Sequence, residues 1–129
     1  MERTLPAEDR ALVAALGLGN YLHVASVVER SRAAGRLILR PEVVDTVERY
    51  VVARGGSAVR APFFHAEKPS PVAGTHHAGS FVSEPASGAR PVLYFGLTEA
   101  FARGAMRADL HGEHALLGRL FAYPSCCAA

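Results

Sequence analysis

Long hydrophobic runs, basic clusters and the common catalytic motifs are all missing from this 129-residue sequence. No uninterrupted apolar stretch is long enough to span a bilayer, so we expect no membrane interaction. The formal net charge is only +2, and the arginines are scattered with Lys68 as the single lysine, which argues against nucleic-acid binding. The P-loop, GxGxxG, GxSxG and HExxH patterns are absent, which argues against a nucleotide-dependent enzyme or a standard hydrolase.

Cysteine is also scarce, because Cys126 and Cys127 are the only two and they are adjacent. Such a pair cannot build the disulfide framework of a small secreted domain. Neighbouring Cα atoms lie about 3.8 Å apart, below the usual disulfide range of roughly 4.4–6.8 Å. The N-terminal residues lead into acidic side chains rather than an apolar targeting core. We therefore expect two free thiols and a cytoplasmic protein.

Helix and strand signals alternate along the chain, with no internal repeat. The length supports a single domain over residues 1–129 with a substantial core. Some residues along the chain commonly begin helices (proline, threonine and asparagine), and glycines commonly end them. Their positions predict helices over about 6–16, 20–34, 41–54, 98–109 and 113–121. Strands are expected at 37–39, 57–64, 81–82 and 92–95, with 65–79 as a long loop. The sum predicts a mixed α/β (α+β) fold with about five helices packed on a small sheet.

Further expectations concern particular residues. Asn20 is expected to cap the second helix and Gly35 to end it, while Pro62 is expected to place a bend or a sheet edge at the end of its strand. The helix after Thr98 is expected to bury Phe101, Ala105 and Leu110. The arginines at 30, 32, 36 and 40 are expected to form a solvated face.

The cysteine pair is the strongest candidate for chemistry. Ser125 after Pro124 is a good N-cap, which would place both thiols in a first helical turn where the dipole favours thiolate. Thiolates serve as nucleophiles, sulfur carriers or metal ligands. The alternative is that one cysteine packs as a small hydrophobe. The sequence ends at Ala129, before such a helix completes two turns, so we expect a module excised from a longer protein.

Histidines supply the candidate partners. His111 and His114 would form a ligand pair at i, i+3 if the last helix begins early, and with Cys126 they are weak candidates for a zinc site. The alternative is that both are solvated or capping side chains. His76 and His77 fall in the long loop, either as acid–base groups on a lid or as exposed polar residues.

Two tyrosines are further candidates. Tyr123, beside the cysteines, and Tyr94, on the expected central strand, could each donate a proton. The alternative for both is packing in the core or at its rim.

The segment 117–127, Leu-Gly-Arg-Leu-Phe-Ala-Tyr-Pro-Ser-Cys-Cys, resembles the hallmark of a small uncharacterised family with a Leu-Gly-Tyr-Pro-x-Cys-Cys signature after a helix. The preceding strand, glycine and helix, followed by His111-Gly112, are similar to that family's pattern, and Ala122 stands where the family usually has glycine. The family includes the domain of unknown function beside the cysteine lyase domain of leinamycin-type polyketide synthases. The resemblance covers about the last third of the chain.

The resemblance implies a sulfur-handling module inside a biosynthetic assembly. Its substrate would be an acyl chain on a carrier protein, with sulfur from a cysteine-derived donor, and its partners would be that carrier and neighbouring enzyme domains. Cys126 or Cys127 would act as thiolate with a histidine as acid–base partner, and no cofactor is expected. A non-catalytic docking domain and a small zinc module are the alternatives.

Overall fold

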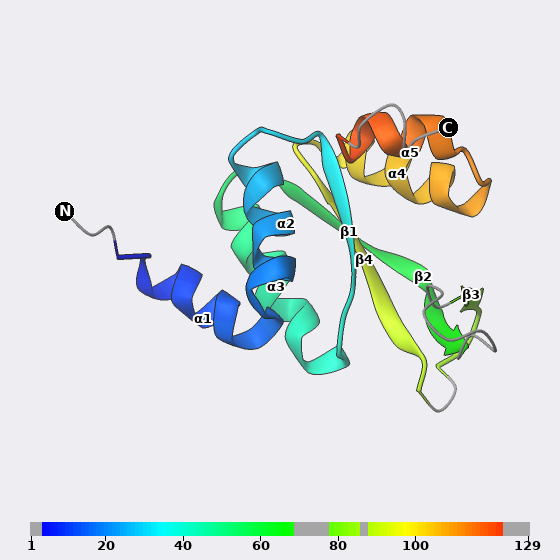
Figure 1. The fold of residues 1–129 in the computed structure, drawn as a ribbon, viewed down its shortest axis with the longest axis horizontal. Helices are drawn as coiled ribbons and strands as arrows, with labels where there is room; N and C mark the ends of the chain where they lie inside the picture. Colours follow the sequence, from blue (N-terminus) through cyan, green and yellow to red (C-terminus); the bar gives the residue numbers. More distant parts are fainter. Residues whose placement is uncertain (1–3, 69–77, 86–87, 123–129) are drawn as a thin grey trace.

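The computed structural model describes residues 4–68, 78–85 and 88–122. Within them the chain forms five α-helices, one short 3-10 helix and a four-stranded antiparallel sheet of order β1-β4-β2-β3 (Figure 1). The elements are α1 (Ala7–Leu16), α2 (Leu18–Val28), β1 (Ala34–Ile38), η1 (Pro41–Val43), α3 (Val44–Ala53), β2 (Ser57–Lys68), β3 (Ala78–Val82), β4 (Arg90–Gly96), α4 (Glu99–Leu110) and α5 (His114–Leu120). The mixed α/β class expected from the sequence is confirmed.

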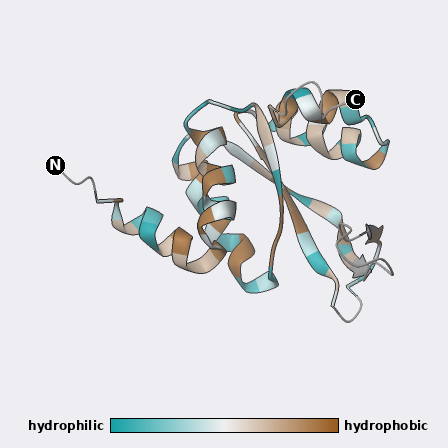
Figure 2. Cartoon of the chain, in the orientation of Figure 1, coloured by the Kyte–Doolittle hydropathy of each residue, from teal (hydrophilic) through white to brown (hydrophobic). Residues whose placement is uncertain are grey.

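Strand β4 lies inside the sheet, and from Val92 to Gly96 it is buried on both faces. Leu93 and Phe95 belong to the core beneath α1, α2 and α3, whereas Val92 and Tyr94 belong to the core beneath α4 and α5. Because successive side chains point to opposite faces, a strand covered on both sides is apolar at every position. The hydrophobic stretches of β1 and β4 accordingly lie between the two helical layers (Figure 2). The sheet thus separates two cores.

Two of the predicted caps are wrong. Helix α2 begins at Leu18, directly after Gly17 at φ +84°, and Asn20 lies inside it with its amide donating to the Leu16 carbonyl at 3.2 Å. The helix ends at Val28, and Gly35 is a residue of β1. Glycine is required at 35 for close packing, because a Cβ there would lie 2.5 Å from the ring of Phe95.

The long loop expected over 65–79 is partly strand. Strand β2 continues to Lys68 and pairs with β3, which begins at Ala78. Pro62 lies within a register shift between Arg60 and Phe64, so the predicted bend is confirmed. The predicted sheet edge is confirmed as well, because among the described residues β3 pairs with β2 only from Phe64 to Lys68, so Pro62 lies on a stretch of β2 that has β4 on one side alone. A bulge tolerates proline here because no ladder hydrogen bond needs its missing N–H.

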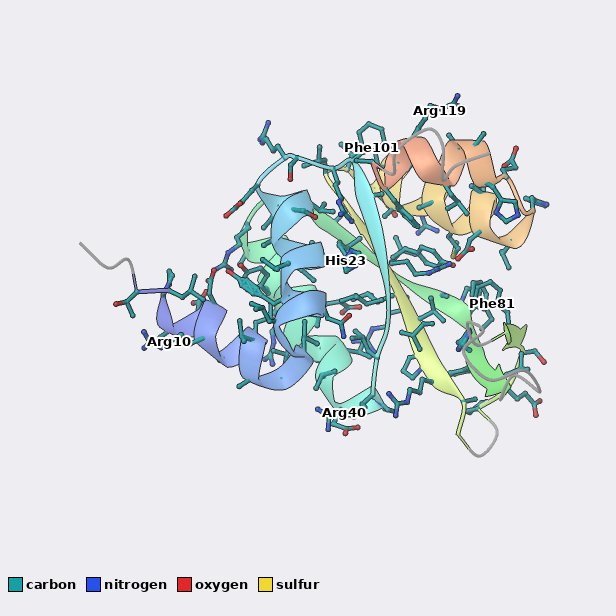
Figure 3. The ribbon with its side chains drawn as sticks, in the orientation of Figure 1. Arg10, His23, Arg40, Phe81, Phe101 and Arg119 are labelled. Carbon is teal, nitrogen blue, oxygen red and sulfur yellow. The ribbon has the colours of Figure 1, made fainter. Side chains whose placement is uncertain are left out.

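Helix α4 is capped as predicted, and of its three side chains predicted to be buried Ala105 is buried. The Thr98 hydroxyl accepts from the Phe101 N–H at 3.2 Å. Phe101 and Leu110 are exposed, which contradicts the prediction, and Figure 3 shows Phe101 projecting outward. The buried face consists of Ala102, Ala105 and Ala108, small side chains that let the helix approach the sheet closely. Among the described residues, none of the helices has the length and apolar content to cross a bilayer.

Candidate functional site

Helices α4 and α5 gather over one end of their face of the sheet, and the β2–β3 hairpin extends away from them (Figure 1). The end of this face that α4 and α5 do not cover carries partly or fully exposed side chains from β1, β2, β3 and β4. We call it the open face and define it by Ile38, His65, Phe81 and Arg90. Figure 3 shows Phe81 at the hairpin, on the side of the sheet where α4 and α5 lie.

A polar cluster lies between the open face and the helices. The Asp109 carboxylate on α4 accepts from the Tyr94 hydroxyl at 2.6 Å and from the Arg36 guanidinium at 2.5 Å. Arg36 and Tyr94 are register partners on β1 and β4, so the sheet itself places both donors beside the carboxylate. Burial, and then the hydrogen bond to Asp109, raises the pKa of the Tyr94 hydroxyl. Tyr94 therefore keeps its proton at neutral pH and uses it in the hydrogen bond to Asp109, and its side chain is fully buried, as the core-packing alternative predicted.

An aromatic row connects this polar cluster to the open face. The ring centroids of Tyr94 and Phe63 are 6.3 Å apart in an edge arrangement, and those of Phe63 and Phe81 are 4.6 Å apart. The ring of His65 follows, 6.1 Å from Phe81. These spacings lie within the range of favourable aromatic pairs. The row lines this side of the sheet with mainly aromatic surface.

A cavity of about 260 Å³ lies at the far end of the row, lined by Ile38, His65, Gly88 and Arg90. His65 and Arg90 are directly opposite each other in the β2–β4 register. Their side chains face the same side as Phe63 and Val92, because residues two apart on a strand share a face. The sheet pairing thus creates a pocket with a cationic side chain and a histidine next to apolar walls.

Helix α5 ends at the polar cluster. Phe121, its buried C-cap, has its ring centroid 6.0 Å from the Arg36 guanidinium carbon. Ala122 follows with φ +56°, a left-handed conformation that strongly favours glycine after a helix. The one position where this chain departs from the glycine of the resembled signature therefore has the backbone conformation that glycine prefers.

The structure describes some of the predicted site residues and not others. Cys126, Cys127 and Tyr123 lie outside the described residues, as do His76 and His77, so each stays a prediction.

His111 and His114 are both described, and both are exposed at the turn between α4 and α5. The proposed i, i+3 pair within one helix is wrong, because α4 ends at Leu110 and Gly112 between the two histidines has φ +66°. Within residues 4–68, 78–85 and 88–122, no group of three or more histidine, cysteine or acidic side chains could hold a metal ion. The described histidine pair therefore gives the zinc alternative no support.

Sequence reasoning missed His65 and Arg90 as site residues and misassigned Arg36. Arg36 was expected on a solvated face, yet it is paired with Asp109, 73 residues away. His65 and Arg90 face each other only because of the sheet register. The available signal was strand alternation, which places Arg36 on the same face as the partly buried Ile38.

A second buried polar cluster lies on the opposite face of the sheet and joins α1 to α2 and α3. Asp9 accepts from the hydroxyls of Tyr21 at 2.7 Å and Tyr50 at 3.1 Å, and from the Arg54 guanidinium at 2.9 Å. The Arg54 guanidinium also lies 3.6 Å from the ring centroid of Tyr50. These hydrogen bonds satisfy the buried carboxylate, so we interpret the cluster as structural.

Comparison of the chain with protein-family models, with curated proteins and with solved structures gave no match in any of the three. Function must therefore be inferred from the residues and geometry of this chain. Two features contribute, namely the open face with its neighbouring polar cluster and the adjacent thiols of Cys126 and Cys127.

Proposed function

We propose that this chain is a sulfur-handling module of a larger biosynthetic assembly, in which Cys126 or Cys127 acts as a thiolate on a carrier-bound acyl chain. The observation that carries the proposal is the position of Phe121 beside Arg36, which makes α5 end at the polar cluster. Cys126 is the fourth residue after Ala122, and four residues span at most about 14 Å. The segment that carries both thiols therefore leaves helix α5 next to the polar cluster and the aromatic row.

The chemistry proposed for the thiol is a redox-neutral transfer. A histidine accepts the thiol proton, and the thiolate attacks the thioester carbonyl of the acyl chain, forming a new C–S bond. The bond to the carrier thiol breaks, and the departing thiolate takes the proton back. The acyl group is then held on the module while a neighbouring domain delivers sulfur from a cysteine-derived donor.

His65 is the histidine that the open face offers for this proton transfer, and His111 and His114 at the α4–α5 turn are the alternatives. Free thiols require a reducing compartment, so the proposal includes a cytoplasmic location.

Alkylation of the two single variants Cys126→Ser and Cys127→Ser tests the thiol directly. One remaining thiol is expected to react with iodoacetamide with an apparent pKa well below 8.5, because reactive cysteines are activated by neighbouring cations or helix ends. The same thiol is expected to acquire an acetyl group from S-acetyl-pantetheine, detected by intact mass. Slow alkylation of both cysteines at the rate of ordinary thiols, with no acetyl adduct, would contradict the proposal.

A non-catalytic docking domain is the second candidate function. It is favoured by Leu18 and Leu22, which lie four residues apart on α2 and are 60% and 57% exposed. Side chains at this spacing share one face of a helix and could contact a neighbouring domain or a carrier protein. Binding of such a partner that survives the Cys126→Ser, Cys127→Ser double change and is lost in Leu18→Ser, Leu22→Ser would favour docking over thiol chemistry.

A further inference from the structure

We infer that the cavity between His65 and Arg90 binds an organic anion that carries a short apolar body. The inference rests on this cavity alone and does not depend on the reactivity of the cysteines. It adds a recognition site to the proposed function.

The charge of the cavity comes from Arg90, and His65 adds a polar side chain. Arginine is always protonated and offers a planar set of N–H donors that matches carboxylate and phosphate oxygens. Histidine adds at least one ring N–H. Among the described residues no acidic side chain lines the cavity, and neither the His65 nor the Arg90 side chain forms a hydrogen bond or an ion pair with another described residue. Arg36 and Arg54, by contrast, are paired with carboxylates.

The remaining walls define the rest of the ligand. Ile38 forms one side, and the ring of Phe81 packs edge-on against His65 and continues into Phe63. An anionic group held by Arg90 would therefore have its attached carbon atoms beside aliphatic and aromatic surface. A volume of about 260 Å³ accommodates a head group and a few carbons rather than a nucleotide.

Carboxylates and phosphate monoesters share the chemistry that this site recognises. The probes are hexanoate, hexyl phosphate and the neutral hexan-1-ol, added to the full chain and followed by amide chemical shifts in two-dimensional NMR. Saturable shifts are expected at Ile38, His65 and Arg90 with at least one anion. Hexan-1-ol is expected to bind at least about tenfold more weakly, since a charge-assisted hydrogen bond is lost. The tighter of the two anions identifies the head group.

Variants separate this site from nonspecific binding. Arg90→Gln is expected to weaken the anion at least about fivefold, whereas Arg90→Lys retains part of the affinity. Arg103→Gln is the matched control, because Arg103 is exposed and, of the residues that the structure describes, pairs with Glu99 alone, on the same helix α4. The Cys126→Ser, Cys127→Ser double variant is expected to bind the anion as tightly as the unchanged chain. Anion binding can therefore be confirmed even if the proposed thiol chemistry fails.

Three results would overturn the inference. They are equal affinity for hexan-1-ol and both anions, equal affinity of the Arg90→Gln variant and the unchanged chain, or no saturable shift at Ile38, His65 and Arg90 up to the solubility of the probes.

Discussion

Replacing Asp9 with asparagine is expected to lower the free energy of unfolding by about 2–3 kcal/mol, because it removes the charge from a buried, paired carboxylate. Asp9 accepts hydrogen bonds from Tyr21, Tyr50 and Arg54 and thereby joins three helices. Asparagine offers one carbonyl oxygen and turns an NH₂ group toward groups that are themselves donors. Urea denaturation followed by far-UV circular dichroism measures the change.

Glu8→Gln is the matched control for this substitution. Glu8 also accepts from Arg54, at 3.2 Å, but its side chain is 76% exposed. Exposed ion pairs contribute little, so the control is expected to change stability by less than about 0.5 kcal/mol. Equal losses for the two variants would show that the buried position of Asp9 has no special role.

The stabilisation by Asp9 is also expected to depend on pH. The hydrogen bond from Tyr21, with those from Tyr50 and Arg54, lowers the pKa of Asp9 although burial acts in the opposite direction. A folded-state pKa below the unfolded value, which is about 3.9, means that the stabilisation is present above that value. It is lost as the pH falls from there through the folded-state pKa. The stability difference between the unchanged chain and Asp9→Asn should therefore shrink below roughly pH 4.

Replacing Gly35 with alanine is expected to lower the free energy of unfolding by about 2–3 kcal/mol, because the core becomes overpacked. The new Cβ would lie 2.5 and 2.6 Å from two ring carbons of Phe95. Phe95 is fully buried in the core beneath α1, α2 and α3, so its ring has little room to move. Either the ring or strand β1 must shift. The midpoint of urea unfolding reports the loss.

Gly104→Ala provides the comparison. A Cβ at this position of α4 has no atom within 4 Å, and alanine is the better helix former by about 0.8–1 kcal/mol. The control is therefore expected to be neutral or stabilising. If Gly35→Ala unfolded at the same urea concentration as the unchanged chain, the close packing of Phe95 on Gly35 would be refuted.

Local signals were sufficient for much of the fold. The apolar run 92–95 predicted the strand that is buried on both faces, and Thr98 predicted the start of α4. Gly35 was misread because a glycine after a helical pattern commonly marks its end. The structure uses that glycine for contact with Phe95, a residue far along the chain, and no local pattern reveals such a contact.

The site was less predictable because it too depends on contacts between residues far apart in the sequence. Arg36 and Asp109 are 73 residues apart, and His65 meets Arg90 only through the β2–β4 register. Phe101 and Leu110 appeared to be core residues because they are large and apolar. The helix instead packs through its alanines, which approach the sheet more closely than large side chains would allow.

The most direct test of the proposed site is the distance between the thiol and the open face. A nitroxide on Cys126 in the Cys127→Ser variant broadens the NMR signals of nearby amides. Broadening is expected at Phe63, His65 and Phe81, and not at Val24 in the core on the opposite side of the sheet. Broadening confined to the outer surface of α4 around Arg103, with the open-face signals unchanged, would contradict a thiol that works at this face.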